Sequence, residues 1–355
     1  LCLSCNDLLD VSNIFFCEGS AILDLSPNCL TISGCLDMSC QNIIDKAFIR
    51  VLNKQKIPIG DMNHSDKEAC GPILNTAKKY FRTSVLSIFS KKKFETCIGE
   101  SVENILFNDS GEITGVRTDK RVIESDYVIL SGGVIGTCDL LLGQKYNITG
   151  ESILNNLAVG KNIQDHTNLR INVRTNKSIN SLNEISNSFN KKFILLFRHI
   201  FGKSTLMKGT GATSAAHLDL NNDGAIDTRI QVVQFVETGR HVSDGKLFSS
   251  TQPGFSISIT AIHPSSKGEI IKDESDVVVM PMYLSSKEDI DLLKLALKFC
   301  LNLLKSSPIN EHILKIEEEF TIKNNPKKYI VDNIFSGYHL IGGTHDAINS
   351  NFEVQ

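Results

Sequence analysis

Residues 126–142 read Asp-Tyr-Val-Ile-Leu-Ser-Gly-Gly-Val-Ile-Gly-Thr-Cys-Asp-Leu-Leu-Leu, and this stretch says most about the fold. Positions 127–130 are all apolar, as is typical of a central strand covered on both faces. The strand leads into a Ser-Gly-Gly turn at 131–133, and a helical segment with three leucines at 140–142 follows. Glycines in such a turn allow the main chain to approach a dinucleotide closely. By themselves, however, they fit close packing of the helix on the strand better than a dinucleotide site.

Upstream of this stretch, hydrophobic periodicity predicts helices followed by a meander of short strands. Apolar side chains at helical spacing predict an amphipathic helix at 41–54, and a second helix is expected at 78–89. Short strands are expected at 100–107, 112–117 and 121–123. The first half of the chain therefore indicates a mixed α/β arrangement around the glycine turn.

Downstream, from about Thr167, the pattern changes to alternating strands separated by loops. The segments 169–173, 231–235 and 255–261 are examples, and a strong amphipathic helix is expected at 287–305. Alternation of this kind predicts an antiparallel sheet with one face buried. We therefore expect a second lobe built on such a sheet.

The composition is that of an ordinary folded protein of about two domains. The 355 residues are 41% hydrophobic and 22% charged, with a net charge of −3. The overall charge indicates neither a nucleic-acid nor an anionic-membrane partner, and no run of apolar residues is long enough for a membrane span. The chain starts with Leu1 and ends in an apolar–polar alternation at 348–354. We therefore expect a fragment, and the sequence does not indicate a compartment.

Two patterns resemble metal sites without completing them. Residues 219–227 carry oxygen ligands at positions 1, 3, 5 and 9 of a calcium loop and glycine at position 6, but Ile230 stands where the bidentate acid is required. A polar hairpin turn is favoured there, with a calcium-stabilised binding module as the alternative. Cys2 and Cys5 form a lone C-x-x-C without a second pair. No metal site is predicted.

Five stretches of the chain have the residue types of one known set of motifs, in the same order. They are 60–63 with 81–84 (Gly-Asp-Met-Asn and Phe-Arg-Thr-Ser), 102–107 with 128–142, 159–166 (Val-Gly-Lys-Asn-Ile-Gln-Asp-His), 264–268 (Pro-Ser-Ser-Lys-Gly) and 338–344 (Tyr-His-Leu-Ile-Gly-Gly-Thr). Together they resemble the signatures of the glucose–methanol–choline (GMC) family of FAD-dependent oxidoreductases. Each match is weak alone, but five in one order are strong.

The chain departs from the family pattern at several positions. Tyr80 replaces a glycine, Cys138 replaces a proline, and an extra glycine intervenes in 342–344. No G-x-G-x-x-G occurs near the N-terminus, where the family binds the FAD pyrophosphate. These departures keep open a second interpretation, a non-catalytic truncated remnant of the family.

The resemblance implies a two-lobed α/β (α+β) GMC-type flavoprotein. It predicts a partial FAD-binding lobe with cap segments at 1–166, without the N-terminal dinucleotide loop. A substrate lobe with an antiparallel sheet would occupy 167–325. The start of a C-terminal return to the FAD lobe would occupy 326–355.

The resemblance also implies which residues approach the cofactor. Gly132 and Gly133 are expected beside FAD, the backbone of Val102 is expected to hold the adenine, and Asn162 is expected to approach the flavin. Packing in a strand core is an equal alternative for Val102. The Asp-His pair at 165–166 is expected to order a turn.

His339 matches the catalytic histidine of the family. Its imidazole, with a pKa near neutrality, is expected to hydrogen-bond or deprotonate the substrate hydroxyl. The implied reaction is FAD-dependent oxidation of an alcohol to a carbonyl, with hydride transfer to flavin N5. The expected partners are a small-molecule alcohol and an electron acceptor, O2 or another. The sequence does not indicate which alcohol is oxidised.

Overall fold

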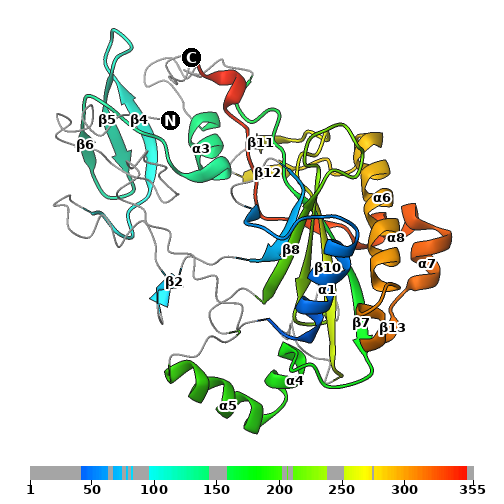
Figure 1. Ribbon diagram of the computed structural model, residues 1–355. Coiled ribbons are helices and arrows are strands. Elements are labelled where there is room, and N and C mark those ends of the chain that lie inside the picture. The colour runs from blue at the N-terminus through cyan, green and yellow to red at the C-terminus, as the bar shows by residue number, and fades with distance from the viewer. Residues whose placement is uncertain are drawn as a thin grey trace.

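The computed structural model describes residues 41–62, 67–73, 77–78, 81–82, 96–143, 158–201, 206, 211–237, 252–273 and 276–349. Figure 1 shows a large antiparallel sheet with helices on it, and a smaller region with its own sheet and one helix. Helices and antiparallel strands therefore combine as the α/β (α+β) prediction expects. None of the helices in these ranges is long and apolar enough to cross a membrane.

The large sheet has seven strands, all antiparallel, in the order β1-β8-β9-β10-β7-β13, with β14 also paired to β7. Its strands are β1 (Ala69–Pro72), β7 (Thr167–Thr175), β8 (Ala212–Leu218), β9 (Thr228–Val233), β10 (Gly254–Ala261), β13 (Ile313–Ile316) and β14 (Phe335–Ser336). β13 and β14 share one edge of β7, because Ile313 pairs with Thr175 and Phe335 pairs with Asn168. The expected antiparallel sheet is confirmed.

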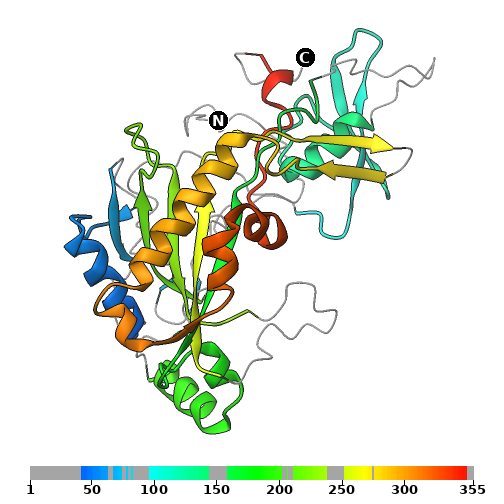
Figure 2. The same cartoon turned by 90° about the vertical axis from the view of Figure 1, so that its right-hand side faces the viewer.

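Helices cover one face of this sheet. They are α1 (Ile43–Lys54), α6 (Lys287–Leu304), α7 (Glu319–Asn324) and α8 (Pro326–Asn333), with the short turn η4 (Ile309–His312). A second short turn, η5 (His345–Ala347), packs in the smaller region instead. Figure 2 shows α6 lying along the sheet. The amphipathic helices expected at 41–54 and 287–305 are confirmed.

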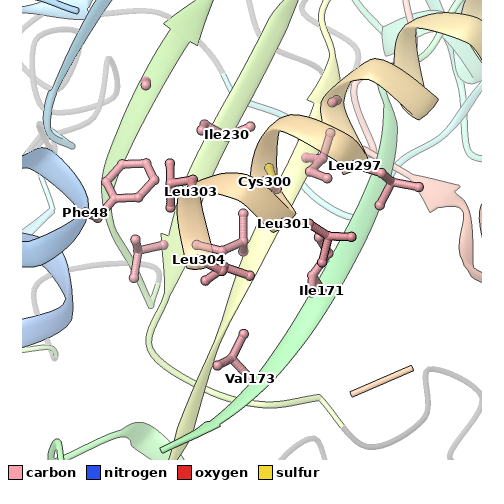
Figure 3. Close-up of a cluster of buried hydrophobic side chains, with 14 of the residues drawn as sticks. Phe48, Ile171, Val173, Ile230, Leu297, Cys300, Leu301, Leu303 and Leu304 are labelled. Carbon is pink, nitrogen blue, oxygen red and sulfur yellow. The ribbon is translucent and has the colours of Figure 1, made fainter. Parts of the chain in front are cut away.

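The main core lies between these helices and the sheet (Figure 3). Phe48 of α1 and Cys300 and Leu303 of α6 are fully buried there, against Ile171 of β7 and Ile230 of β9. Burial alternates along β7, so every second side chain enters this core. The intervening positions point to the opposite face of the sheet, which is therefore polar.

A buried carboxylate joins α1 to the sheet. Asp45 accepts hydrogen bonds from the hydroxyls of Thr213 and Ser214, both at 2.6 Å, and from Nε2 of Gln234 at 2.8 Å. Burial raises the pKa of Asp45, although the bonds from Ser214 and Thr213 oppose this. The three donors satisfy a group that would otherwise be costly to bury.

The smaller region contains the elements around the glycine turn. It holds the sheet of β4 (Val102–Phe107), β5 (Ile113–Thr118) and β6 (Val122–Glu124), the helix α3 (Gly133–Leu142), and the hairpin of β11 (Glu269–Asp273) and β12 (Asp276–Met280). The three strands of the meander are confirmed. Ile105 of β4 and Leu141 of α3 share one buried cluster, which fixes the helix against the sheet.

Two predicted elements differ from the structure. Residues 127–130 form no strand, and the Tyr127 side chain is 69% exposed. An extended segment becomes a strand when a neighbour supplies hydrogen-bond partners, and no described strand does so here. In place of the start of the helix at 78–89, the short strands β2 (Ala77–Lys78) and β3 (Phe81–Arg82) pair with each other. The remainder of that predicted helix lies outside the described residues.

Two further helices follow β7, α4 (Leu182–Ser186) and α5 (Phe189–Ile200). Periodicity did not single them out in a region expected to be strands. The loop at 219–227 connects β8 and β9, as the hairpin interpretation expects. Its carboxylates accept backbone N–H groups of the same loop, for example Asp227 from Asn221 at 2.9 Å and Asp219 from Gly224 at 2.9 Å.

Candidate active site

Two of the matched stretches, distant in sequence, lie side by side. The backbones of Gln164 and Ile341 exchange hydrogen bonds of 3.0 and 2.9 Å, and the N–H of Gly337 donates to the carbonyl of His166 at 2.8 Å. The N–H of Gly160 donates to the carbonyl of Gly343 at 2.6 Å. The structure therefore brings the segments 159–166 and 338–344 together, 170 or more residues apart along the chain.

The paired segments also contact α3 and the fourth matched stretch. The N–H of Ile163 donates to the carbonyl of Gly268 at 3.0 Å, and the N–H of Gly268 donates back to Ile163 at 2.8 Å. The buried side chain of Ile163 packs with Cys138 of α3 and Ile270 of β11. Four of the five matched stretches thus meet in one place.

The two adjacent glycines of the last segment are required by its geometry. Gly342 and Gly343 have φ angles of +89° and +79°, a region that other residues rarely adopt. A Cβ on Gly342 would collide with the carbonyl of Asn162, and a Cβ on Gly343 would lie 2.7 Å from the sulfur of Cys138. The extra glycine therefore has a structural cause in this chain.

We expect Gly343→Ala to destabilise the protein by about 2–4 kcal/mol, because the cost of a left-handed backbone at alanine adds to the cost of an overpacked contact. Gly111→Ala is the matched control, since its φ is +82° and nothing lies within 4 Å of the added Cβ. That control should cost about 1 kcal/mol. Urea unfolding of both variants measures the difference, and a cost no larger than that of Gly111→Ala would contradict the steric account.

A buried carboxylate organises the turn between the two segments. Asp165 is 5% exposed and accepts hydrogen bonds from the hydroxyls of Tyr283 at 2.5 Å and Ser336 at 2.6 Å. Its other oxygen accepts from the backbone N–H of His339 at 2.9 Å. Burial alone would raise the pKa of Asp165, but these bonds together lower it. Burial and donation to Asp165 raise the pKa of Tyr283 to about 12.

The network around Asp165 places two histidines side by side. Nδ1 of His166 lies 3.2 Å from Nδ1 of His339, and the rings meet edge to face with centroids 5.3 Å apart. Burial, then the neighbouring His339 and His263, lower the pKa of His166, although Asp165 opposes them. The His339 ring is exposed, so a substrate can reach it.

Contacts with the large sheet fix the backbone that leads to His339. β14 leaves the end of α8 and pairs with the start of β7. Arg170 of β7 lies over the ring of Phe335, with 5.5 Å to the centroid, and its guanidinium pairs with Glu237 at 2.5 Å. The hydroxyl of Tyr329 in α8 donates to the carbonyl of Arg170 at 2.6 Å. These contacts hold the His339 loop against the sheet.

Sequence reasoning missed the polar face of the sheet next to His339. Thr260 donates to Oδ1 of Asn168, and both lie in one row across the strands with Arg229. A Cβ on Gly337 would lie 3.2 Å from Nδ2 of Asn168, so this row adjoins the His339 loop. Strand alternation beginning at Thr167 is the signal that could have placed Asn168 and Arg170 on this face.

The two glycines at the start of α3 have different surroundings. A Cβ on Gly132 would lie 3.3 Å from the backbone of Gly136, a tight contact, so close packing against the helix favours glycine here. Gly133 has a φ of +70° and is exposed, and nothing lies within 4 Å of a Cβ added there. No side chain caps the N-terminus of α3, and its first turn has no acidic residue. Free N–H groups and an open glycine fit an anionic dinucleotide.

The remaining predicted residues lie at the periphery. Asn162 has a φ of +54°, and its Nδ2 donates to Asp346 at 2.5 Å. Its exposed side chain lies in the segment that pairs with the His339 loop. Val102 begins β4, half-buried and opposite Thr118. The structure thus gathers His339 and Asn162 in the paired segments, and no described contact joins Val102 to them.

Solved structures with the same fold are known, although no model of a protein family and no curated protein matches the sequence. Formate oxidase of Aspergillus oryzae matches with a TM-score of 0.74 at 14% identity, over 88% of this chain and 63% of that one. Pyridoxine 4-oxidase from Mesorbium loti has a TM-score of 0.66 at 12% identity, over 89% and 63%.

A third match is an FAD-dependent oxidoreductase from Chaetomium thermophilum, with a TM-score of 0.70 at 11% identity, over 86% and 64%. The chain spans about three fifths of the length of these structures. The matched enzymes belong to the GMC group of flavoenzymes. The described part of this chain therefore has the fold of the GMC oxidoreductases.

Proposed function

We propose that the protein is an FAD-dependent oxidoreductase that oxidises an alcohol to a carbonyl compound, with His339 as the base. The observation that carries this proposal is the meeting of the glycine turn before α3, the segment 159–166 and the His339 loop. FAD, when bound, supplies the hydride acceptor. Gly132, Gly133 and Asn162 are the residues proposed to hold it. The backbone of Val102 is proposed to bind the adenine.

The two facing histidines determine which nitrogen of His339 is free. A neutral imidazole has one N–H and one lone pair, so at a distance of 3.2 Å one Nδ1 donates and the other accepts. For His339 to act as a base, its Nδ1 donates to Nδ1 of His166, which leaves the lone pair on Nε2. The lowered pKa of His166 keeps that acceptor unprotonated at neutral pH. His166 is therefore a positioning residue in this proposal.

The proton of the substrate hydroxyl then goes to Nε2 of His339. The resulting imidazolium keeps its Nδ1–H bond to His166, so the ring does not reorient during the transfer. Asp165 holds the loop by the backbone N–H of His339 and not by its ring.

The departures from the family pattern support an intact site rather than a degraded remnant. Cys138, which replaces a proline, is fully buried, and its sulfur lies 3.5 Å from the carbonyl of Gly343. Gly343 belongs to the segment with the extra glycine. The two departures thus contact each other and fit together. Such matched packing is expected of an intact site and not of a degraded one.

The proposal is tested by mixing the full-length, FAD-loaded protein with a panel of primary and secondary alcohols without oxygen. The expected result is bleaching of the visible flavin band and formation of the matching aldehyde or ketone. Methyl ethers of the same alcohols are the control, because they have no hydroxyl proton for His339 to remove. Bound flavin that no alcohol bleaches would contradict the proposed reaction.

The lobe boundaries at 166 and 325 and the electron acceptor, O2 or another, stay predictions. β7 begins at Thr167, directly after the site segment. Oxygen consumption with and without an artificial acceptor would distinguish an oxidase from a dehydrogenase.

A further inference from the structure

The helix α5 has an apolar surface that points away from the protein. The helix contains no buried residue. Phe189 is 83% exposed, Phe193 is 61% exposed and Phe197 is 53% exposed. We call the seven exposed apolar side chains the apolar face of α5: Phe189, Phe193, Ile194, Leu196, Phe197, Ile200 and Phe201.

Helical geometry puts these side chains on one side. At about 100° per residue they fall within an arc of about 160°, which Asn190 alone interrupts. Phe197 stacks with Phe193 and contacts Phe201 in a tilted arrangement, with ring centroids 6.4 and 4.3 Å apart. Lys192 borders the arc on one side and Arg198 borders it on the other.

The opposite side of α5 faces the body of the protein. Lys191, Leu195 and His199 are the partly buried members of this helix. Nζ of Lys191 pairs with the carboxylate of Glu184 at 2.8 Å, which ties α5 to α4. A surface helix ordinarily turns its apolar stripe inward and its charged side outward. In α5 this orientation is reversed, so packing among the described residues does not account for the apolar face.

The charge around the helix indicates the kind of surface that the apolar face fits. Residues 187–208 contain five Lys or Arg and no Asp or Glu, whereas the whole chain has a net charge of −3. A second copy docked on the same face would bring like charges together. An anionic surface would be attracted to Lys192 and Arg198 at both borders of the arc.

We propose that α5 docks the protein on an anionic lipid surface, with its apolar face inserted at the boundary of headgroups and acyl chains. Phenylalanine on one side and Lys or Arg on the flanks are the composition of helices that lie in a membrane interface. Figures 1 and 2 show α5 at one end of the molecule, where a flat surface can reach it. This docking does not depend on the proposed oxidation.

The test uses the full chain and sedimented vesicles of phosphatidylcholine mixed with phosphatidylserine. The protein is expected to bind these vesicles and to bind pure phosphatidylcholine much less. The variant Phe193→Ser/Phe197→Ser should bind the anionic vesicles about 30-fold more weakly, because two aromatic rings are no longer transferred from water into the membrane on binding. Lys192→Ala/Arg198→Ala should lose about 30-fold on the anionic vesicles and little on neutral ones.

A spectroscopic reporter gives a second readout, because the sequence contains no tryptophan. Phe197→Trp places a single fluorophore on the apolar face, and its emission should shift to the blue with anionic vesicles. Phe320 of α7 is also exposed, at 79%, and makes a matched control. Phe320→Ser should keep vesicle binding, and Phe320→Trp should show no shift. Since all these side chains are exposed, the variants are expected to unfold at the wild-type temperature.

Three results would overturn the proposal. They are absence of binding to the anionic vesicles, equal binding by the wild type and Phe193→Ser/Phe197→Ser, and an unshifted Phe197→Trp emission. A concentration-dependent dimer that the same double variant abolishes would assign the apolar face to a second copy instead.

Discussion

Replacing His339 with alanine is expected to slow reduction of the bound flavin by the alcohol about 10²–10⁴-fold. The variant retains the backbone N–H that Asp165 accepts, so the loop should keep its position. It loses Nε2, the atom proposed to receive the hydroxyl proton. Stopped-flow absorbance in the absence of oxygen measures this rate directly, with binding of the alcohol separated from the chemical step by varying its concentration.

His312→Ala is the matched control for this prediction. His312 lies at the opposite end of β7, where its carbonyl accepts from the N–H of Asn176 at 3.1 Å. That backbone bond survives the substitution, so flavin reduction should stay at the wild-type rate. Reduction of His339→Ala at an unchanged rate would show that another group is the base.

Asp165→Ala is expected to lower the free energy of unfolding by about 3–4 kcal/mol, because three donors lose a charged acceptor. The hydroxyls of Tyr283 and Ser336 and the N–H of His339 are these donors. Asp165→Asn retains one acceptor oxygen and should cost roughly half as much. Urea unfolding measures both variants, with Asp276→Ala at an exposed strand end as the control.

The same carboxylate predicts a pH dependence. The pKa of Asp165 is lower in the folded protein than in the unfolded chain, so its stabilisation is complete above the unfolded pKa of about 3.9. It is lost as the pH falls through the folded pKa. The stability difference between wild type and Asp165→Asn should therefore shrink as the pH is lowered below about 4. A difference that does not change with pH would show that Asp165 is not ionised in the folded state.

The sequence predicted best those parts of the fold that depend on local periodicity. The helix at 41–54, the helix at 287–305 and the alternating strands follow from side chains that alternate between core and solvent. The prediction of a strand at 127–130 was wrong. A uniformly apolar run indicates that a strand would be buried, but it does not show whether a partner strand exists. The prediction that a helix begins at residue 78 was wrong, because β2 and β3 pair there instead.

The motifs predicted which residues form the candidate site, but not how they are arranged. The motifs named His339, Gly132, Gly133, Val102 and Asn162. They did not show that His166 faces His339, since that contact needs the pairing of two segments far apart in sequence. The outward orientation of α5 was equally unpredictable. The helical spacing of its apolar residues predicts the apolar face, but not that the opposite side, with Lys191 paired to Glu184, faces the protein.

The central claim is that the glycine turn, the segment 159–166 and the His339 loop together hold a flavin. The most direct measurement is the absorbance spectrum of the full-length protein after incubation with FAD and removal of unbound cofactor. We expect the visible flavin bands to remain with the protein. A colourless protein, with all of the FAD recovered in the small-molecule fraction, would contradict the account.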